Sequence, residues 1–128
     1  MTDPQRPRIL IADDEPNILI SLEYLLKREG YEVSLARDGD EALAAIVAQR
    51  PALVLLDVMM PKRSGFEVCA ELRANEATKD TLVLMLSAKG RETDVAKGLG
   101  SGADAYMTKP FSTKELVAKV REMLEPRA

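Results

Sequence analysis

The chain has 128 residues, of which 46% are hydrophobic and 30% are charged, a balance typical of a globular domain and not of a disordered or fibrous protein. A net charge of −3 argues against direct binding of this chain to nucleic acid, and its single cysteine excludes an internal disulfide framework. The polar segment 1–8 and the lack of any apolar run of membrane-spanning length predict a cytoplasmic protein that does not enter a membrane.

Five short apolar runs alternate along the chain with five stretches in which apolar residues have helical spacing. In chain order, the expected elements are a strand at 9–12, a helix at 18–26, a strand at 32–35, a helix at 42–47, a strand at 53–56, a helix at 64–73, a strand at 82–86, a helix at 92–99, a strand at 105–107 and a helix at 116–124. Strands that alternate with helices predict a parallel sheet between two helical layers.

The pattern within each run predicts its place in the sheet. Residues 9–12, 53–56 and 82–86 are apolar throughout, as expected for central strands that are buried on both faces. Residues 32–35 alternate between polar and apolar, as expected for a half-covered edge strand. These patterns favour an α/β fold with a five-stranded parallel sheet in the flavodoxin-like order 2-1-3-4-5, flanked by five helices. We expect residues 1–128 to form a single domain.

Polar side chains gather where the expected strands end, and ligands of open parallel sheets bind at that edge. Asp13 and Asp14 follow the first strand, Asp57 the third, Ser87 the fourth and Lys109 the fifth. Three converging carboxylates repel one another unless a countercharge is present, and a hard cation such as Mg²⁺ (or Mn²⁺) is the natural one. With a lysine and a hydroxyl to bind an oxyanion, the set predicts in-line phosphoryl transfer to Asp57.

Each of these residues alone has a simpler explanation. Asp13 and Asp14 could cap a helix or form a turn, Ser87 could be a turn hydroxyl, and Lys109 could be a solvated loop residue. Chance does not usually place three acids, a hydroxyl and a lysine at four coincident strand ends, so their joint position favours the phosphoryl-transfer interpretation.

Four motifs together resemble the receiver domains of response regulators. Residues 57–65, which read Asp-Val-Met-Met-Pro-Lys-Arg-Ser-Gly, resemble the phosphorylation segment of that family. The acidic pair lies in 13–15, the hydroxyl position in 87–88 and the lysine signature in 109–111. The motifs occur in the family's order, and the resemblance covers a core of about 8–124. It implies a signalling phosphoacceptor that catalyses only its own phosphorylation and dephosphorylation, and not an enzyme in the usual sense.

The resemblance also assigns roles around the phosphoacceptor. It implies that Asp57 receives a phosphoryl group from a sensor histidine kinase or a phosphotransfer protein. It implies that Asp14, Asp57 and the backbone carbonyl of Met59 bind Mg²⁺ directly, and that Asp13 binds it through water. Lys109 would bind the phosphoryl oxygens.

Ser87 and Tyr106 are the switch pair that the resemblance implies. Ser87 would move towards the phosphoryl group, which the backbone of Ala88 would also bind, and Tyr106 would then turn into the vacated space. The simpler alternative for Tyr106 is an ordinary amphipathic residue of an edge strand. The peptide bond between Lys109 and Pro110 is expected to be cis.

The implied output surface is formed by the fourth helix, the fifth strand and the fifth helix, at about 91–125. Its charged candidates are Lys97, Asp104, Glu115 and Lys119. They would bind a downstream protein, an attached effector domain or, after activation, a second copy of the chain. A homodimer like that of winged-helix transcription factors fits only in part, because Ala105 stands where that subfamily usually has a second acid.

Met59 and Lys89 are expected to modulate the lifetime of the phosphoaspartate. Met59 lies two residues after Asp57, and Lys89 lies two after Ser87, positions that flank the path of the hydrolytic water in this family. A bulky apolar group and a cation there predict a persistent phosphoaspartate.

Three other functions remain as alternatives. A haloacid-dehalogenase phosphatase would have a second acid at the position of Met59, and a flavodoxin would not place the acids of 13–15 against a phosphate. A pseudo-receiver that binds partners without phosphorylation is the third alternative, and the complete acidic set argues against it. The end of the chain fits either a single-domain regulator or the receiver of a longer protein.

Overall fold

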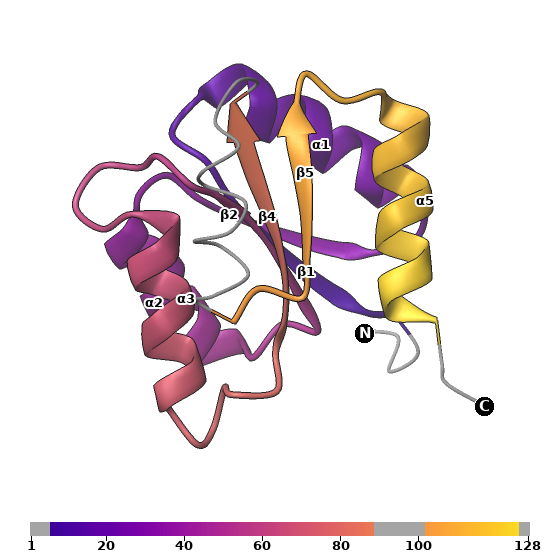
Figure 1. Ribbon diagram of the computed structural model, residues 1–128. Coiled ribbons are helices and arrows are strands. Elements are labelled where there is room, and N and C mark those ends of the chain that lie inside the picture. Colours follow the sequence, from indigo (N-terminus) through magenta and orange to yellow (C-terminus); the bar gives the residue numbers. More distant parts are fainter. Residues whose placement is uncertain (1–5, 89–101, 126–128) are drawn as a thin grey trace.

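The computed structural model describes residues 6–88 and 102–125, which form a parallel sheet covered by helices on both faces (Figure 1). The strands are β1 (Arg8–Ala12), β2 (Glu32–Ala36), β3 (Leu53–Asp57), β4 (Leu82–Ala88) and β5 (Ala105–Lys109). The helices are α1 (Pro16–Arg28), α2 (Gly39–Gln49), α3 (Gly65–Ala74) and α5 (Thr113–Leu124). The helix expected at 92–99 lies outside the described residues.

The strand order is β2-β1-β3-β4-β5, and every adjacent pair is parallel, which confirms the predicted fold class. Every residue of β3 is buried, whereas most of β2 is only partly buried, as predicted for a central and an edge strand. β3, β4 and β5 are longer than predicted. Asp57, Ser87 and Lys109 therefore lie within the ends of their strands and not after them.

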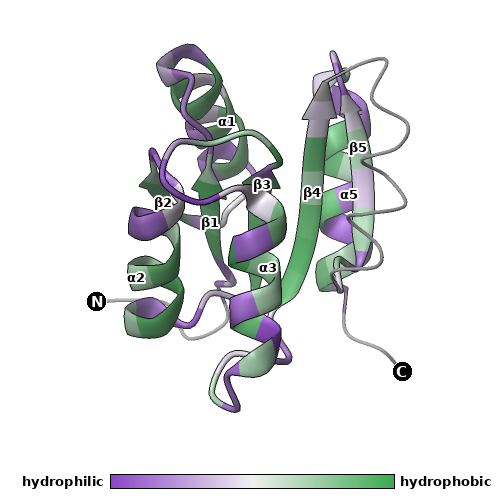
Figure 2. Ribbon diagram, turned by 60° about the vertical axis from the view of Figure 1, so that its left-hand side comes forward, coloured by the Kyte–Doolittle hydropathy of each residue, from purple (hydrophilic) through white to green (hydrophobic). Residues whose placement is uncertain are grey.

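Alternate residues of the central strands face two separate hydrophobic clusters. Leu10 and Val54 pack with α2 and α3, whereas Ile9 and Leu55 pack with α1 and α5. Figure 2 shows hydrophobic residues along β1 and β4, whereas the helices carry both hydrophobic and hydrophilic residues. Burial on both faces fixes the register of the strands, because a slip by one residue would turn each side chain to the wrong face.

Side-chain caps fix the starts of the helices that follow β2 and β3. Asp38 accepts a hydrogen bond from the Glu41 backbone N–H, and Ser64 with Glu67 forms a reciprocal capping box. Such caps satisfy backbone donors that the helix itself leaves unpaired. In the described part of the chain, no helix combines the length and the apolar character that crossing a bilayer requires.

Candidate functional site

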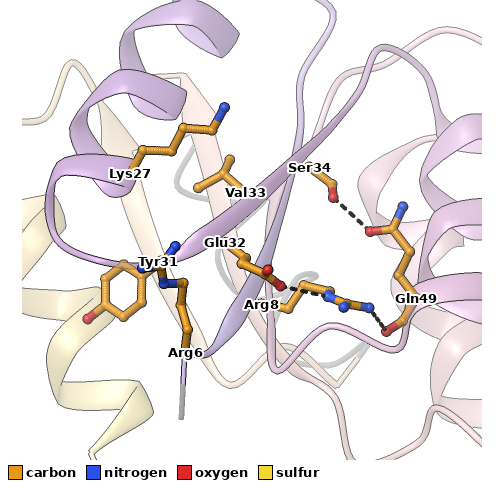
Figure 3. Close-up of a pocket in the computed structure, with 8 residues that line it drawn as sticks. All are labelled: Arg6, Arg8, Lys27, Tyr31, Glu32, Val33, Ser34 and Gln49. Carbon is orange, nitrogen blue, oxygen red and sulfur yellow. Dashed lines mark hydrogen bonds and ion pairs between the residues drawn. The ribbon is translucent and has the colours of Figure 1, made fainter. Parts of the chain in front are cut away.

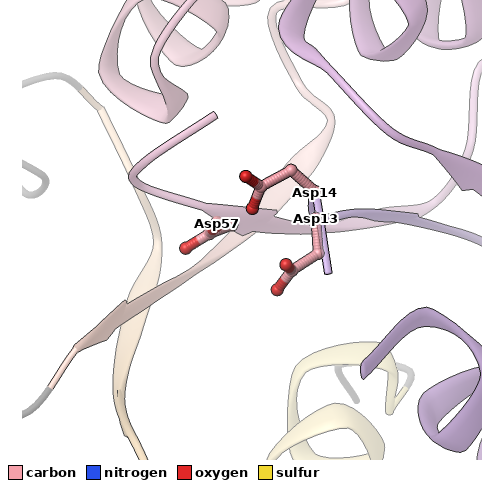
Figure 4. Close-up of side chains that lie close together, drawn as sticks. All are labelled: Asp13, Asp14 and Asp57. Carbon is pink, nitrogen blue, oxygen red and sulfur yellow. The ribbon is translucent and has the colours of Figure 1, made fainter. Parts of the chain in front are cut away.

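Three aspartates come together at the carboxyl edge of the sheet (Figure 4). Asp13, Asp14 and Asp57 each have a carboxylate oxygen within 4.8 Å of those of the other two. β1 and β3 are neighbours in register up to Ala12 and Leu56, so the next residues of the two strands must lie side by side. Asp13 is fully buried and Asp57 is 6% exposed, whereas Asp14 is exposed to solvent.

Lys109 brings a positive charge to this cluster from β5. Its ammonium nitrogen Nζ lies 2.8 Å from Oδ2 of Asp13 and 3.4 Å from Oδ1 of Asp57. The peptide bond between Lys109 and Pro110 is cis. Three carboxylates against one ammonium leave a net charge of −2 when all are ionised, and a bound cation would compensate that excess.

The electrostatics of the cluster centre on Asp57. Burial and, to a lesser extent, the charge of Asp13 raise the pKa of Asp57 from 3.8 to about 6. The charge of Lys109 and hydrogen bonds from Lys109 and the Met59 backbone N–H oppose this shift. Burial works to lower the pKa of Lys109, but its hydrogen bond to Asp13 and the charge of Asp57 raise it overall.

Asp13 and Asp14 differ in what their carboxylates contact. Asp13 accepts hydrogen bonds on both oxygens, from the Glu15 backbone N–H at 2.9 Å and from Lys109 at 2.8 Å. Among the described residues, none makes a hydrogen bond or ion pair with the Asp14 side chain. The oxygen donors, the solvent-exposed carboxylate and the uncompensated charge fit the preferences of a hard divalent cation.

The remaining residues expected at the site lie at different distances from the cluster. Ser87 is buried near the end of β4, the strand that pairs with β3 and β5. Tyr106 in β5 is half-buried and packs against the hydrophobic cluster on the α2 and α3 face. Met59 is 55% exposed, two residues after the end of β3. Lys89 and Lys97 lie outside the described residues.

Two of the residues expected on the output surface already have partners within the chain. The Asp104 carboxylate pairs with Arg73 at 2.7 Å and accepts from the Val83 backbone N–H at 2.8 Å. Lys119 lies 3.9 Å from Glu122 on the same helix. Glu115 is exposed in the first turn of α5. The Asp104 contacts tie the turn before β5 to α3 and β4.

A glycine at the start of α3 allows that helix to approach β3. A Cβ atom at Gly65 would lie 2.4 Å from the carbonyl oxygen of Asp57, so any larger residue would displace one of the two backbones.

Nearby, Arg63 pairs with Asp40 and Glu71 at 2.8 Å each. No short-range sequence pattern marks Arg63, because its partners lie on α2 and α3.

A second hollow lies at the opposite edge of the sheet, at the amino ends of β1 and β2 (Figure 3). Arg8 pairs with Glu32 at 3.4 Å and donates to the Gln49 carbonyl at 3.2 Å, and the Ser34 hydroxyl lies 2.7 Å from the Gln49 side-chain oxygen. These bonds join β1, β2 and α2. Glu32 is the single carboxylate among the described residues that line this hollow, so it holds no second acidic cluster.

Comparison with known proteins identifies the family. The family model of the response regulator receiver domain matches residues 9–121. The chain belongs to this family. It is therefore the phosphoacceptor domain of a two-component signalling system, and Asp13, Asp14 and Asp57 form its acidic phosphorylation pocket. This membership favours a signalling phosphoacceptor over a haloacid-dehalogenase phosphatase or a flavodoxin.

Two curated relatives match most of the chain. The alkaline phosphatase synthesis transcriptional regulatory protein PhoP of Bacillus subtilis is 48% identical over 117 residues, which are 91% of this chain and 48% of PhoP. The DNA-binding response regulator MtrA of Mycolicibacterium smegmatis is 46% identical over 122 residues, which are 95% of this chain and 52% of MtrA. The chain thus spans about half the length of these relatives.

Solved receiver structures have the same fold. A response regulator of Chloroflexus aurantiacus has a TM-score of 0.90 and 36% identity, with 94% of this chain and 98% of that chain covered. The receiver domain of a sensor histidine kinase of Pseudomonas aeruginosa has a TM-score of 0.85 and 29% identity, with 92% and 97% covered. That protein holds a magnesium ion in its active-site cleft.

Replacement of Asp57 by asparagine should stabilise the metal-free protein at neutral pH. Because the pKa of Asp57 is raised to about 6, the folded state binds more protons than the unfolded state between about pH 4 and 6, and the free energy of unfolding falls as the pH rises through this window. Because asparagine cannot ionise, the free energy of unfolding of Asp57→Asn does not fall in this way as the pH rises. Urea unfolding in EDTA should show a gain of about 1 to 3 kcal/mol near pH 7.5 and a much smaller one near pH 4. An equal gain at both pH values would contradict the charge assignment.

Proposed function

We propose that Asp57 of this receiver domain is phosphorylated in a Mg²⁺-dependent reaction, and that phosphorylation changes the surface formed by β5, α5 and the fourth helix expected from the sequence. The observation that carries the proposal is the buried Asp57 carboxylate, which lies beside two other aspartates and 3.4 Å from the Lys109 ammonium. A buried carboxylate with this charge imbalance is poised to bind a cation and a phosphoryl group together.

The chain's own groups orient the reacting carboxylate. Asp14, Asp57 and the Met59 backbone carbonyl would bind Mg²⁺ (or Mn²⁺) directly, with Asp13 reaching it through water. Bound there, the cation would neutralise charge on the carboxylates and on the phosphoryl oxygens. The Met59 backbone N–H donates to Asp57, so this hydrogen bond holds the attacking group in place and favours its ionised form.

Three groups from β4 and β5 would bind the incoming phosphoryl group. Lys109 can donate to a phosphoryl oxygen while it retains its 2.8 Å contact with Asp13, because an ammonium group has three donors. The Ser87 hydroxyl and the Ala88 backbone N–H would bind further oxygens, since β4 ends beside Asp57. Such fixed donors stabilise charge that develops during phosphoryl transfer.

Tyr106 would couple the site to the output surface. Its strand, β5, also carries Lys109, and Tyr106 pairs in register with Met85 two residues before Ser87. A shift of Ser87 towards the phosphoryl group would therefore alter the packing beside Tyr106. The affected surface would include Asp104, Glu115 and Lys119, together with Lys97.

The proposed partners follow from the family and from the relatives' length. We infer that a sensor histidine kinase, directly or through a phosphotransfer protein, supplies the phosphoryl group. The relatives named as transcriptional or DNA-binding regulators are about twice as long as this chain. The output would therefore be an attached effector domain, a separate target protein or a second copy, with nucleic acid bound by the effector and not by the receiver.

Intact-mass measurement tests the proposal directly. After incubation with Mg²⁺ and acetyl phosphate, the wild-type protein should gain one phosphoryl group, whereas Asp57→Asn and wild type in EDTA should gain none. The reason is that the buried Asp57 carboxylate is the nucleophile and needs the cation to offset its neighbours' charge. A folded wild-type protein that gains no mass would instead support a pseudo-receiver.

Replacement of Met59 should shorten the lifetime of the phosphoaspartate. The Met59 side chain is 55% exposed two residues after Asp57, where its bulk would hinder the hydrolytic water. We expect Met59→Asn, alone or with Lys89→Glu, to lose phosphate about fivefold faster, which corresponds to about 1 kcal/mol in activation free energy. Decay of the intact-mass signal after removal of acetyl phosphate measures the rate. Met59→Leu, which keeps the bulk, is the matched control, and equal decay of all these proteins would contradict the steric account.

A further inference from the structure

The loop that carries Met59 is anchored at its base by backbone contacts. The Gly65 N–H donates to the Val58 carbonyl at 2.8 Å, and the Val58 N–H donates to the Leu86 carbonyl at 3.0 Å. The close approach of Gly65 to the Asp57 carbonyl brings α3 against the same point. Both ends of the loop from Val58 to Ser64 are therefore held next to the phosphoacceptor strand.

The far side of the loop is anchored by the side chain of Arg63. Its Nε donates to Oδ1 of Asp40 at 2.8 Å, and its Nη1 donates to Oε1 of Glu71 at 2.8 Å. Asp40 lies in the first turn of α2, and Glu71 lies in α3. The planar guanidinium can bind both carboxylates at once in a fixed geometry. Arg63 thus links the loop to two helices.

The loop backbone also packs closely on the start of α2. A Cβ atom at Gly39 would lie 2.4 Å from both the Cβ and the carbonyl oxygen of Arg63, and the Gly39 N–H donates to the Pro61 carbonyl at 3.2 Å. Between these contacts, Lys62 adopts a φ of 72°, which non-glycine residues rarely do. A rare backbone conformation of this kind persists where several surrounding contacts hold it in place.

We propose that Arg63 is a positioning residue of the phosphorylation site. By joining α2 and α3, it holds the loop so that the Met59 backbone N–H reaches Asp57 and the Met59 carbonyl stays available to the cation. This inference rests on the proposed function, since it assumes that the acidic cluster binds Mg²⁺. It extends that function to a residue whose own side chain need not touch the reacting groups.

A positioning role and a purely electrostatic role of Arg63 predict opposite effects of Arg63→Ala on the affinity for Mg²⁺. A nearby positive charge opposes cation binding, so its loss alone would leave Mg²⁺ affinity unchanged or increase it. Loss of a positioning contact would instead weaken binding, because the Met59 carbonyl would no longer be held in place. Groups that orient metal ligands typically change affinity in this second direction when they are removed.

The first experiment measures the Mg²⁺ dissociation constant at fixed pH, from the rise in unfolding temperature with Mg²⁺ concentration. We expect a weakening of about three- to tenfold for Arg63→Ala. Arg63→Lys should recover part of the loss, because a lysine offers one point charge to two carboxylates. Gly39→Ala, which changes no charge but would displace the Arg63 backbone, should also weaken binding.

A matched control removes a comparable ion pair far from the site. Glu29 pairs with Arg121 at 3.0 Å between α1 and α5, and Glu29→Ala should leave Mg²⁺ affinity unchanged. A second readout needs no metal: hydrogen exchange of the Met59 backbone amide should be faster in Arg63→Ala than in wild type or Glu29→Ala, because the loop is released. A generally destabilised protein would show faster exchange in the sheet as well.

The outcomes separate this inference from the proposed function. If wild type binds Mg²⁺ and is phosphorylated, while Arg63→Ala binds Mg²⁺ equally well or better and protects the Met59 amide equally, Arg63 is not a positioning residue. If wild type itself neither binds Mg²⁺ nor accepts a phosphoryl group, the proposed function fails, whatever the behaviour of the variants.

Discussion

The electrostatic repulsion between the buried carboxylates of Asp13 and Asp57 is the constraint on which the site depends. Both side chains are buried. Among the described residues, Lys109 supplies a positive charge beside them, and its ammonium group contacts both carboxylates. One ammonium cannot balance these two carboxylates and the adjacent Asp14. Burial and, to a lesser extent, the charge of Asp13 raise the pKa of Asp57 above that of a free aspartate. The cluster is stabilised by any group that supplies further positive charge. Cation binding relieves this imbalance, and a phosphoryl group, which adds negative charge, would need that cation and Lys109 to offset it.

The sheet brings these like charges together, and it also supplies the stability that offsets their repulsion. Parallel pairing of β1, β3, β4 and β5 brings residues from distant parts of the sequence to one edge, because all their carboxyl ends point the same way. The strands behind that edge are buried between two hydrophobic clusters, and their burial supplies the stability that offsets the crowded charges. The buried strands thus fix the position of Asp57, whereas an exposed loop held by Arg63 carries the Met59 backbone to it.

Much of this arrangement could be predicted from the sequence, because hydrophobic patterns act locally. The unbroken run at 53–56 and the alternating run at 32–35 gave the correct strand positions, and together with the other runs they gave the correct order. From the residues at the predicted strand ends, we expected Asp13, Asp57 and Lys109 to lie close together, and in the structure they do. Strand ends were less predictable, since backbone pairing continued through polar residues such as Asp57 and Lys109.

Contacts between long polar side chains and distant elements could not be predicted in this way. Arg63 binds residues of two other elements, and Arg73 binds Asp104 across 31 positions of the sequence. No local pattern specifies such pairs, because they depend on how the helices pack and on which rotamers that packing allows. Asp104 is an example: no sequence pattern predicted that its carboxylate binds Arg73 and the Val83 backbone.

The most direct test of the central claim is the number of protons released when Mg²⁺ binds, measured by calorimetry in buffers of different ionisation enthalpy. If the buried Asp57 carboxylate has a pKa of about 6 and binds the cation, about half a proton should be released per ion near pH 6 and almost none near pH 8. In Asp57→Asn the release near pH 6 should disappear. Release close to zero at both pH values, in a protein that binds Mg²⁺, would contradict the claim that cation binding relieves the charge imbalance at Asp57.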